Sequence, residues 1–306
     1  MSFLHKLTAL GIHVLERGWL SSNCTLLLGA TDAALVDSGF HTQSPQTLSW
    51  LHGLLKDRSL ELLINTHLHS DHCGGNAAIQ RAFPELRTAI PATSASAVSS
   101  WQAERLSFVS TGQDCPRFEA SDLLQDGQSL SLGGSRWHVW QAKGHDPDSV
   151  VLFQEDNRIL ISADALWEDG FGVVFPELSH GAAFDDVEHT LNMIEDLNPD
   201  MVIPGHGPVF QDVGAALLRA RSRLDHFRRH PDKHTRHAIK VLIKFKLLEW
   251  QRVSTADLLL WCRTTPLVSA HMPVDAQTSE AWLQELLTQL AHVSALRIDG
   301  PWVFNR

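Results

Sequence analysis

Tyrosine is absent from this chain of 306 residues, and cysteine occurs only four times. Cys24, Cys73, Cys115 and Cys262 lie far apart and form no Cys-x-x-Cys pair. This spacing argues against a structural zinc knuckle and against a disulfide framework, and it is typical of proteins in a reducing compartment. We therefore expect a cytoplasmic protein.

Long hydrophobic runs are missing as well. No segment approaches the roughly 18 consecutive apolar residues that a membrane span needs. His5, Lys6 and His13 interrupt the apolar stretch at the N-terminus, which therefore does not match a secretory signal. The chain also has no Gly-x-Ser-x-Gly or His-Glu-x-x-His motif to indicate a serine nucleophile or a zinc-binding protease helix. We expect neither a membrane-bound nor an exported protein.

The composition is that of a globular protein with a full core, because 43% of the residues are hydrophobic and 20% are charged. The charge is unevenly distributed. Residues 1–212 hold 11 Lys and Arg against 27 Asp and Glu, whereas residues 213–306 hold 14 against 8. The first part therefore has a net charge of −16 and the second of +6. This asymmetry predicts two domains, 1–212 and 213–306.

Strand and helix patterns alternate in the first part. Short apolar runs indicate two strands around a turn at 29–32, a buried strand before His67, and hairpins that turn at 133–134 and near 155–157. Helical periodicity covers 44–55, 94–106 and 185–197. Strands mixed with helices in this way predict an α/β fold in which helices cover the sheets.

The second part changes to helical patterns. Apolar residues recur with helical spacing over 213–230, 233–250, 254–264 and 277–292, and a final hairpin turns at Asp299-Gly300. Helices closed by a hairpin indicate a small winged-helix-like module.

The run from His67 to Gly75, HLHSDHCGG, carries the strongest chemical signal. In extended backbone His67 and His69 point to the same side, and Asp71 and His72 follow where the chain turns. Imidazole and carboxylate groups are ligands for zinc, manganese or iron. A histidine-rich surface loop is the alternative, but four ligand-type side chains directly after a buried strand favour a metal site that can serve two cations.

Three more ligand-type residues lie at the ends of predicted strands. His145 lies in AKGHDPDS, Asp164 ends ILISAD, and His206 lies in VIPGHGP. Loops at strand ends are where a rigid scaffold displays functional groups. We therefore expect these three side chains to join the site.

The segments VDSG, THLHSDHCGG, KGHDPDS, SAD and PGHG, in this order, resemble the metallo-β-lactamase superfamily over roughly residues 10–210. The resemblance implies an αββα sandwich with a binuclear metal centre, most simply of zinc, with manganese or iron as alternatives. It assigns His67, His69 and His145 to the first metal, assigns Asp71, His72 and His206 to the second, and makes Asp164 a bridging ligand. Asp37 matches an aspartate that usually supports the site.

The chain departs from the family pattern at Lys143 and Asp148, on either side of His145. Cys73 follows His72 directly and either touches the metal or simply opens a helix. We favour the second interpretation, because no ligand position is vacant. The C-terminal module is similar to the winged-helix-like domain of the β-lactamase-like 2 group.

The resemblance implies a hydrolase in which a metal-bridging hydroxide attacks the substrate and Asp71 orients the water or carries a proton. Relatives resembling glyoxalase II and the homoserine-lactone hydrolases use tyrosines that this chain lacks. We expect a small-molecule acyl substrate, a thioester or related ester. An apolar mouth would come from Trp167, Phe171, Phe175 and His180, unless these residues only pack the domain contact.

A basic segment in the second part suggests other functions. Its side chains would suit an RNA backbone, as a metal-dependent ribonuclease needs. Alternatively, they would dock on the acidic first part or form a homodimer. We favour docking or dimerisation over RNA binding. A mono-iron dioxygenase-like enzyme and a non-catalytic nucleic-acid-binding regulator are further alternatives. Nearby histidines, including His234 and His237, are expected at the surface. The basic residues are Arg219, Arg221, Arg223, Arg228, Arg229, Lys233, Arg236, Lys240, Lys244 and Lys246.

Overall fold

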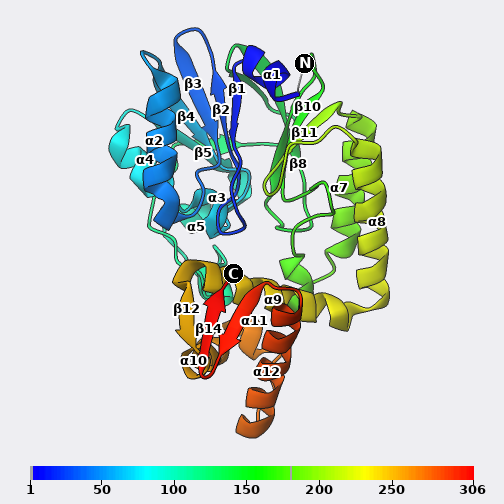
Figure 1. Cartoon of the computed structure of the whole chain (residues 1–306). Helices are drawn as coiled ribbons and strands as arrows, with labels where there is room; N and C mark the ends of the chain where they lie inside the picture. The colour runs from blue at the N-terminus through cyan, green and yellow to red at the C-terminus, as the bar shows by residue number, and fades with distance from the viewer. Residues whose placement is uncertain (1–2, 180) are drawn as a thin grey trace.

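The computed structural model describes residues 3–179 and 181–306. Two sheets face each other, and helices cover their outer sides (Figure 1). The first sheet has the order β1-β2-β3-β4-β5-β6 and the second the order β11-β10-β9-β8-β7. The predicted αββα sandwich is therefore confirmed. The strands are β1 Ile12–Leu15, β2 Cys24–Leu28, β3 Asp32–Val36, β4 Ser59–Ile64, β5 Arg87–Pro91, β6 Asp122–Leu124, β7 Ser129–Leu132, β8 Ser135–Gln141, β9 Val150–Gln154, β10 Ile159–Ala163 and β11 Met201–Pro204.

Three apolar cores hold these layers together. Side chains such as Leu27 and Ile64 of the first sheet pack against Trp137 and Leu152 of the second. On the outer faces, α2 and α4 cover the first sheet, whereas α7 and α8 cover the second. Strands such as β9 and β10 are largely apolar and are buried along their whole length, because successive side chains point to opposite faces and both faces of each sheet are covered. The helices before Arg229 are α1 Phe3–Ala9, α2 Ser44–Leu55, α3 Ser70–Cys73, α4 Asn76–Ala82, α5 Ala95–Ser99, α6 Phe108–Thr111, α7 Phe184–Leu197 and α8 Val213–Arg229.

Most predicted elements are present, but the helix predicted over 94–106 is wrong. Only α5 is helical there, and turns follow it. Trp101 adopts φ 49° and Ser107 φ 64°, left-handed values that a continuing helix cannot contain. Trp101 and Phe108 still reach a common apolar core, because the turns bring them there. The apolar residues are spaced as the pattern suggested, but turns between the short helices α5 and α6 bring them to the core, not one continuous helix.

The C-terminal part lies beneath the two sheets (Figure 1). It packs around its own apolar core, which also takes in Val173 and Leu178 of the preceding part. Because α8 shares an apolar core with α7, the predicted domain boundary at residue 212 stays a prediction. The predicted winged-helix likeness of the C-terminal part also stays a prediction. Within the described chain, no helix combines the length and apolar character needed to cross a membrane. The elements are α9 Pro231–Trp250, β12 Arg252–Ser254, α10 Thr255–Thr264, α11 Pro266–Ser269, α12 Ala276–His292, β13 Leu296–Asp299 and β14 Trp302–Asn305, with sheet order β12-β14-β13.

His234 on α9 is buried, so the surface position predicted for it is wrong. Its ring packs edge-on against Phe184 of α7 and Phe227 of α8, so these contacts connect α9 with both helices. Burial, assisted by the charge of Arg223, lowers the pKa of His234 to about 4. The side chain is therefore neutral near pH 7 and belongs to the packing between helices.

Candidate metal centre

Loops that leave neighbouring strands meet at one edge of the sandwich. Strand β4 pairs in parallel with β3 and β5, and β10 pairs in parallel with β11, so the loops after these strands emerge together. The loop between β8 and β9 adds His145. All seven predicted ligands are buried, and the structure brings them together. Three groups have ligand atoms within 4.8 Å of one another, namely His67 with His69 and His145, His67 with His72 and Asp164, and Asp71 with His72 and His206.

The backbone around Asp164 is shaped for close packing. Ala163 adopts φ 47°, a left-handed conformation that ends β10 and is uncommon for a residue other than glycine. A Cβ atom at Gly205 would collide with Asp164 Oδ1, so the residue before His206 must lack a side chain. Trp167 Nε1 donates to the same Oδ1 over 3.2 Å. The carboxylate is therefore held in one orientation by its surroundings.

The first group consists of three imidazoles whose nitrogens converge. His145 Nδ1 lies 2.6 Å from the Val173 carbonyl oxygen and must donate to it, which leaves a lone pair on His145 Nε2. That Nε2 lies 2.8 Å from His69 Nδ1, and His67 Nε2 lies 3.0 Å from the same atom. Burial and the neighbouring imidazoles lower the pKa of His69 to about 3 and that of His67 well below its usual value. Neutral imidazoles with converging nitrogens suit a bound cation.

The second group has more acceptors than donors. His72 Nδ1 donates to Asp37 Oδ2 over 2.8 Å, and the buried His72 Nε2 has no hydrogen-bond partner among the described residues. That Nε2 lies 3.3 Å from Asp164 Oδ1 and 3.8 Å from Asp71 Oδ2. Burial alone would lower the pKa of His72, but the carboxylates of Asp164, Asp37 and Asp71 raise it well above its usual value. The site therefore needs positive charge at this point.

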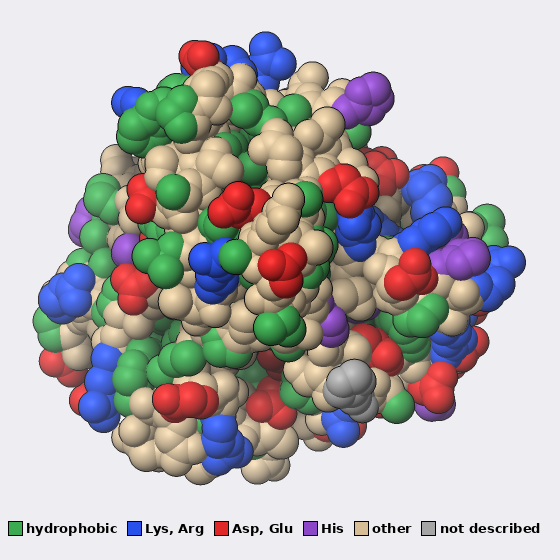
Figure 2. All heavy atoms as spheres, turned by 90° about the horizontal axis from the view of Figure 1, so that it is seen from below, with side chains coloured by type: hydrophobic (Ala, Val, Ile, Leu, Met, Phe, Trp, Pro, Cys, Tyr) green, Lys and Arg blue, Asp and Glu red, His purple; other side chains and the backbone are tan. Residues whose placement is uncertain are grey.

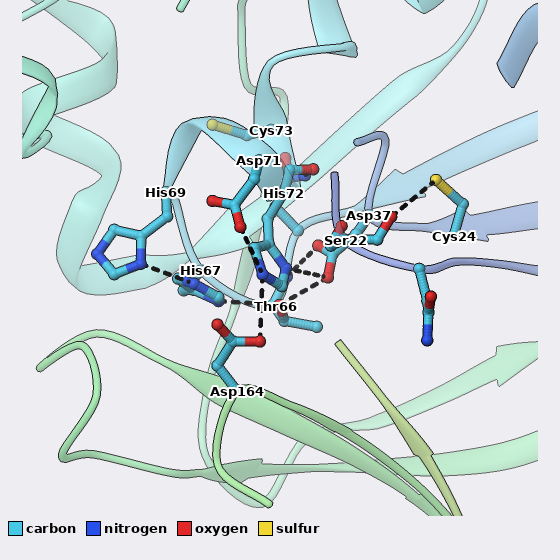
Figure 3. Close-up of polar contacts among 12 residues, drawn as sticks. Ser22, Cys24, Asp37, Thr66, His67, His69, Asp71, His72, Cys73 and Asp164 are labelled. Carbon is cyan, nitrogen blue, oxygen red and sulfur yellow. Dashed lines mark hydrogen bonds and ion pairs between the residues drawn. The ribbon is translucent and has the colours of Figure 1, made fainter. Parts of the chain in front are cut away.

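Both groups fit divalent metal ions, because imidazole nitrogens and carboxylate oxygens are the ligands that such ions prefer, and a bound cation would supply the positive charge beside His72. Figure 3 shows His67, His69, Asp71, His72 and Asp164 around a common centre. In the same view the sulfur of Cys73 points away from that centre.

Cys73 has partners of its own on the far side. Its Sγ lies 3.5 Å from the Leu68 carbonyl oxygen and 3.8 Å from Cys115 Sγ. Cys73 ends α3 and does not open a helix. Its packing is that of a buried apolar residue, not that of a ligand.

Asp37 supports the site from behind. Its Oδ1 accepts from the Thr66 backbone N–H at 2.9 Å, and its Oδ2 accepts from Thr66 Oγ1 and from His72 Nδ1, each at 2.8 Å. These bonds hold both the loop that carries His67 and the imidazole of His72. Partners of this kind fix the orientation and raise the basicity of a metal-binding histidine.

We expect Asp37→Ala to weaken metal binding about 10- to 100-fold, because His72 and the Thr66 loop lose their common acceptor. Competition with a fluorescent chelator would measure the affinity. Asp32→Ala, at the opposite end of β3, is the control and should leave the affinity unchanged. Equal affinities in the Asp37 variant and the wild type would show that this hydrogen-bond network is dispensable.

The ligands open into a cavity of about 230 Å³. Trp167, Phe171 and Phe175 line it, as predicted, whereas His180 lies outside the described residues. Two contributions were not predicted. Trp19 stacks on His206 with 5.3 Å between ring centroids, and α9 supplies a wall with His237, Val241, Leu242 and Phe245. The four-residue spacing of 237, 241 and 245 places these side chains on one face of the helix, a signal that the sequence contained.

Several basic side chains of α8 pair with acidic residues of the first part. Arg221 pairs with Glu195 at 2.6 Å, and Arg228 pairs with Asp185 at 2.6 Å and with Glu188 at 2.8 Å. These contacts support the docking interpretation for this face of α8.

Comparisons with known proteins agree with the geometry. The model of the Metallo-beta-lactamase superfamily matches residues 17–206. The acyl-coenzyme A thioesterase MBLAC2 of Homo sapiens is 26% identical over 243 residues, which cover 71% of this chain and 84% of that protein. The beta-lactamase-like protein 2 homolog of Caenorhabditis elegans is 27% identical over 226 residues, covering 73% of this chain and 66% of that protein. A beta-lactamase domain protein from Burkholderia ambifaria has a similar fold, with a TM-score of 0.59 and 19% identity over 97% of this chain and 92% of that one.

Proposed function

The chain belongs to the metallo-β-lactamase superfamily, and we propose that it is a binuclear metal-dependent hydrolase of thioesters or related acyl esters. The observation that carries the proposal is a cluster of buried metal-ligand side chains that opens into an apolar cavity. The relatives named as acyl-coenzyme A thioesterases support the same substrate class. Zinc is the proposed metal, and manganese or iron also suits the donor set.

We assign His67, His69 and His145 to one metal ion, and Asp71, His72 and His206 to the other. Asp164 supports a bridging role because it reaches both groups. Its Oδ2 lies 3.3 Å from His145 Nε2, and its Oδ1 lies 3.3 Å from His72 Nε2. When bound, a pair of divalent cations activates water and polarises a carbonyl group.

Asp71 is the proposed catalytic side chain. It borders the cavity, and its Oδ2 accepts a hydrogen bond from His206 Nε2 over 3.0 Å. Burial alone would raise the pKa of Asp71, but His72 and His206 lower it, so the carboxylate is ionised near pH 7. An ionised carboxylate at this place can orient the attacking water and accept its proton at Oδ2.

The acyl group would lie against the apolar wall of the cavity. Contact between that wall and an acyl chain contributes about 25 cal/mol of binding free energy per Å² of apolar surface removed from water. No side-chain nucleophile is required, because water attacks the acyl carbon and the thiol or alcohol leaves. The apolar wall is formed by Phe171, Val173, Phe175, Val241, Leu242 and Phe245.

Hydrolysis assays of the metal-loaded protein test the proposal against its main alternative, a ribonuclease. We expect release of thiol from acyl thioesters and no cleavage of single-stranded RNA. RNA cleavage without thioester hydrolysis would contradict the proposal. A protein with neither activity would favour the non-catalytic regulator.

Reversing three basic side chains, Arg228, Arg229 and Lys233, to Glu provides a second test. We expect unchanged hydrolysis of a small uncharged ester and no salt-dependent RNA binding in the wild type, because Arg228 is already paired with Asp185 and Glu188. Thermal stability should fall, since the reversal sets like charges against α7. Micromolar RNA binding that weakens steeply with salt, and that the reversal removes, would instead favour the nuclease. Sedimentation of both proteins would show whether the same face forms a homodimer.

A further inference from the structure

Arg223 on α8 lies between the metal cavity and a second, open groove. Arg223 and His237 line both spaces, so the groove adjoins the cavity. The groove has a volume of about 740 Å³. Its lining is rich in basic side chains and consists of Leu218, Arg219, Ser222, Arg223, His226, Phe227, Lys233 and His237.

The guanidinium of Arg223 forms no close ion pair among the described residues, although the charge of Asp169 acts on it from beyond salt-bridge distance. It is half-buried beside the rings of Phe171 and Phe227, with 5.9 and 5.8 Å to their centroids. Its only hydrogen bonds among the described residues are long, at 3.4 Å, to the carbonyl oxygens of Asp169 and Phe171. The Asp169 carboxylate pairs with Arg219 at 3.3 Å instead. In the described part of the chain, no carboxylate oxygen lies within 4.0 Å of Arg223.

Partial removal of a cation from water is unfavourable unless an anion compensates for it. Burial accordingly lowers the pKa of Arg223, although an arginine stays charged near pH 7. Burial and the charge of Arg223 also lower the pKa of the adjacent His237 to about 4, so this imidazole is neutral and adds no competing charge. At the boundary between cavity and groove, Arg223 is therefore a charged side chain whose partial burial only the more distant Asp169 offsets among the described residues.

The neighbouring backbone is built to admit this side chain. Gly170 adopts φ 132°, and a Cβ atom there would lie 2.6 Å from Arg223 Nη1. Any larger residue would push the guanidinium out of its position beside the loop. Lys233 lines the same groove and adds positive charge to it. Figure 2 shows Lys, Arg and His side chains gathered, with some acidic ones, along the edge of the molecule on the α8 side.

We propose that Arg223 binds an anionic group on the thiol half of the substrate, a phosphate or a carboxylate, while the acyl half lies against α9. The inference rests on the proposed thioester hydrolysis and identifies the class of thiol that the enzyme accepts. The apolar wall of the cavity suits the uncharged acyl chain. The thiol half leaves the metal centre through the mouth of the cavity, where Arg223 offers a fork of N–H donors to a carboxylate or phosphate.

Steady-state hydrolysis with three thioesters of one acyl group tests the inference. Acyl-coenzyme A carries phosphates, S-acylglutathione carries carboxylates, and acyl-N-acetylcysteamine is uncharged. Arg223→Met should raise KM about tenfold or more for a charged thioester, because a charge-assisted hydrogen bond is lost, and should leave kcat nearly unchanged. KM for the uncharged thioester should stay within about twofold. The charged substrate that is affected identifies the anion as phosphate or carboxylate.

Arg229→Met is the matched control, because Arg229 lies exposed on the same helix and donates only to the Asp225 carbonyl oxygen among the described residues. It should change none of the three KM values. If Arg223→Met changes KM equally for all three thioesters, or for none, Arg223 only packs the loop and the inference is wrong.

Equilibrium binding of free coenzyme A and glutathione separates this inference from the proposed function. A wild type that hydrolyses no thioester but binds one of these thiols, with binding lost in Arg223→Met, would contradict the proposed function and support the role of Arg223. A wild type that binds neither thiol would overturn the inference.

Discussion

Asp164→Ala should lower kcat/KM on the order of a thousandfold or more, which is the largest effect that we expect from one substitution. Asp164 lies between the two ligand groups, with one oxygen 3.3 Å from His145 Nε2 and the other 3.3 Å from His72 Nε2. Removing it would loosen both metals at once. Activity measured together with metal content would show whether the two fall together.

Cys73→Ala is the matched control for this substitution. Cys73 is buried next to His72, but its sulfur contacts Cys115 and the Leu68 carbonyl oxygen. We expect metal content to remain and stability to fall only slightly, because alanine retains the helix and leaves a small gap. If Cys73→Ala abolished metal binding and Asp164→Ala did not, the ligand assignment would be wrong.

Metal removal should have the second largest effect. Protein purified without chelator should hold about two equivalents of divalent metal, since we assign the seven side chains of the three overlapping groups to two metal ions. Chelation should abolish hydrolysis and lower Tm by roughly 5–10 °C, because ligands that bind only the folded state stabilise it. Adding zinc back should restore both.

The number of metals decides between mechanisms. A chain that binds one metal at most under saturating conditions would contradict the binuclear centre and favour the mono-iron dioxygenase-like alternative. Restoration of Tm without restoration of activity would show that the added metal differs from the functional one. Elemental analysis of each preparation would separate these outcomes.

Local patterns predicted much of the fold. The helix over 44–55 was predicted at its observed limits, and the hairpins at 133–134 and near 155–157 join strands as expected. Such elements depend on nearby residues, through apolar spacing and turn-forming side chains. The failure at 94–106 has the opposite cause, because contacts with Phe108 and Phe118, which lie farther along the chain, hold Trp101 against the core without a continuous helix.

The sequence by itself determined which side chains can hold metal and that each lies on a loop at a strand end. Both could be predicted because the chemical type of a side chain and the apolar pattern of a strand depend only on nearby residues. Only the tertiary structure decided how these loops meet, that Asp164 reaches both groups, and that α9 closes the cavity. It also decided that Arg223 forms no close ion pair among the described residues, whereas Arg221 and Arg228 on the same helix do. These relations join residues far apart in the chain, and their distances depend on how the layers pack.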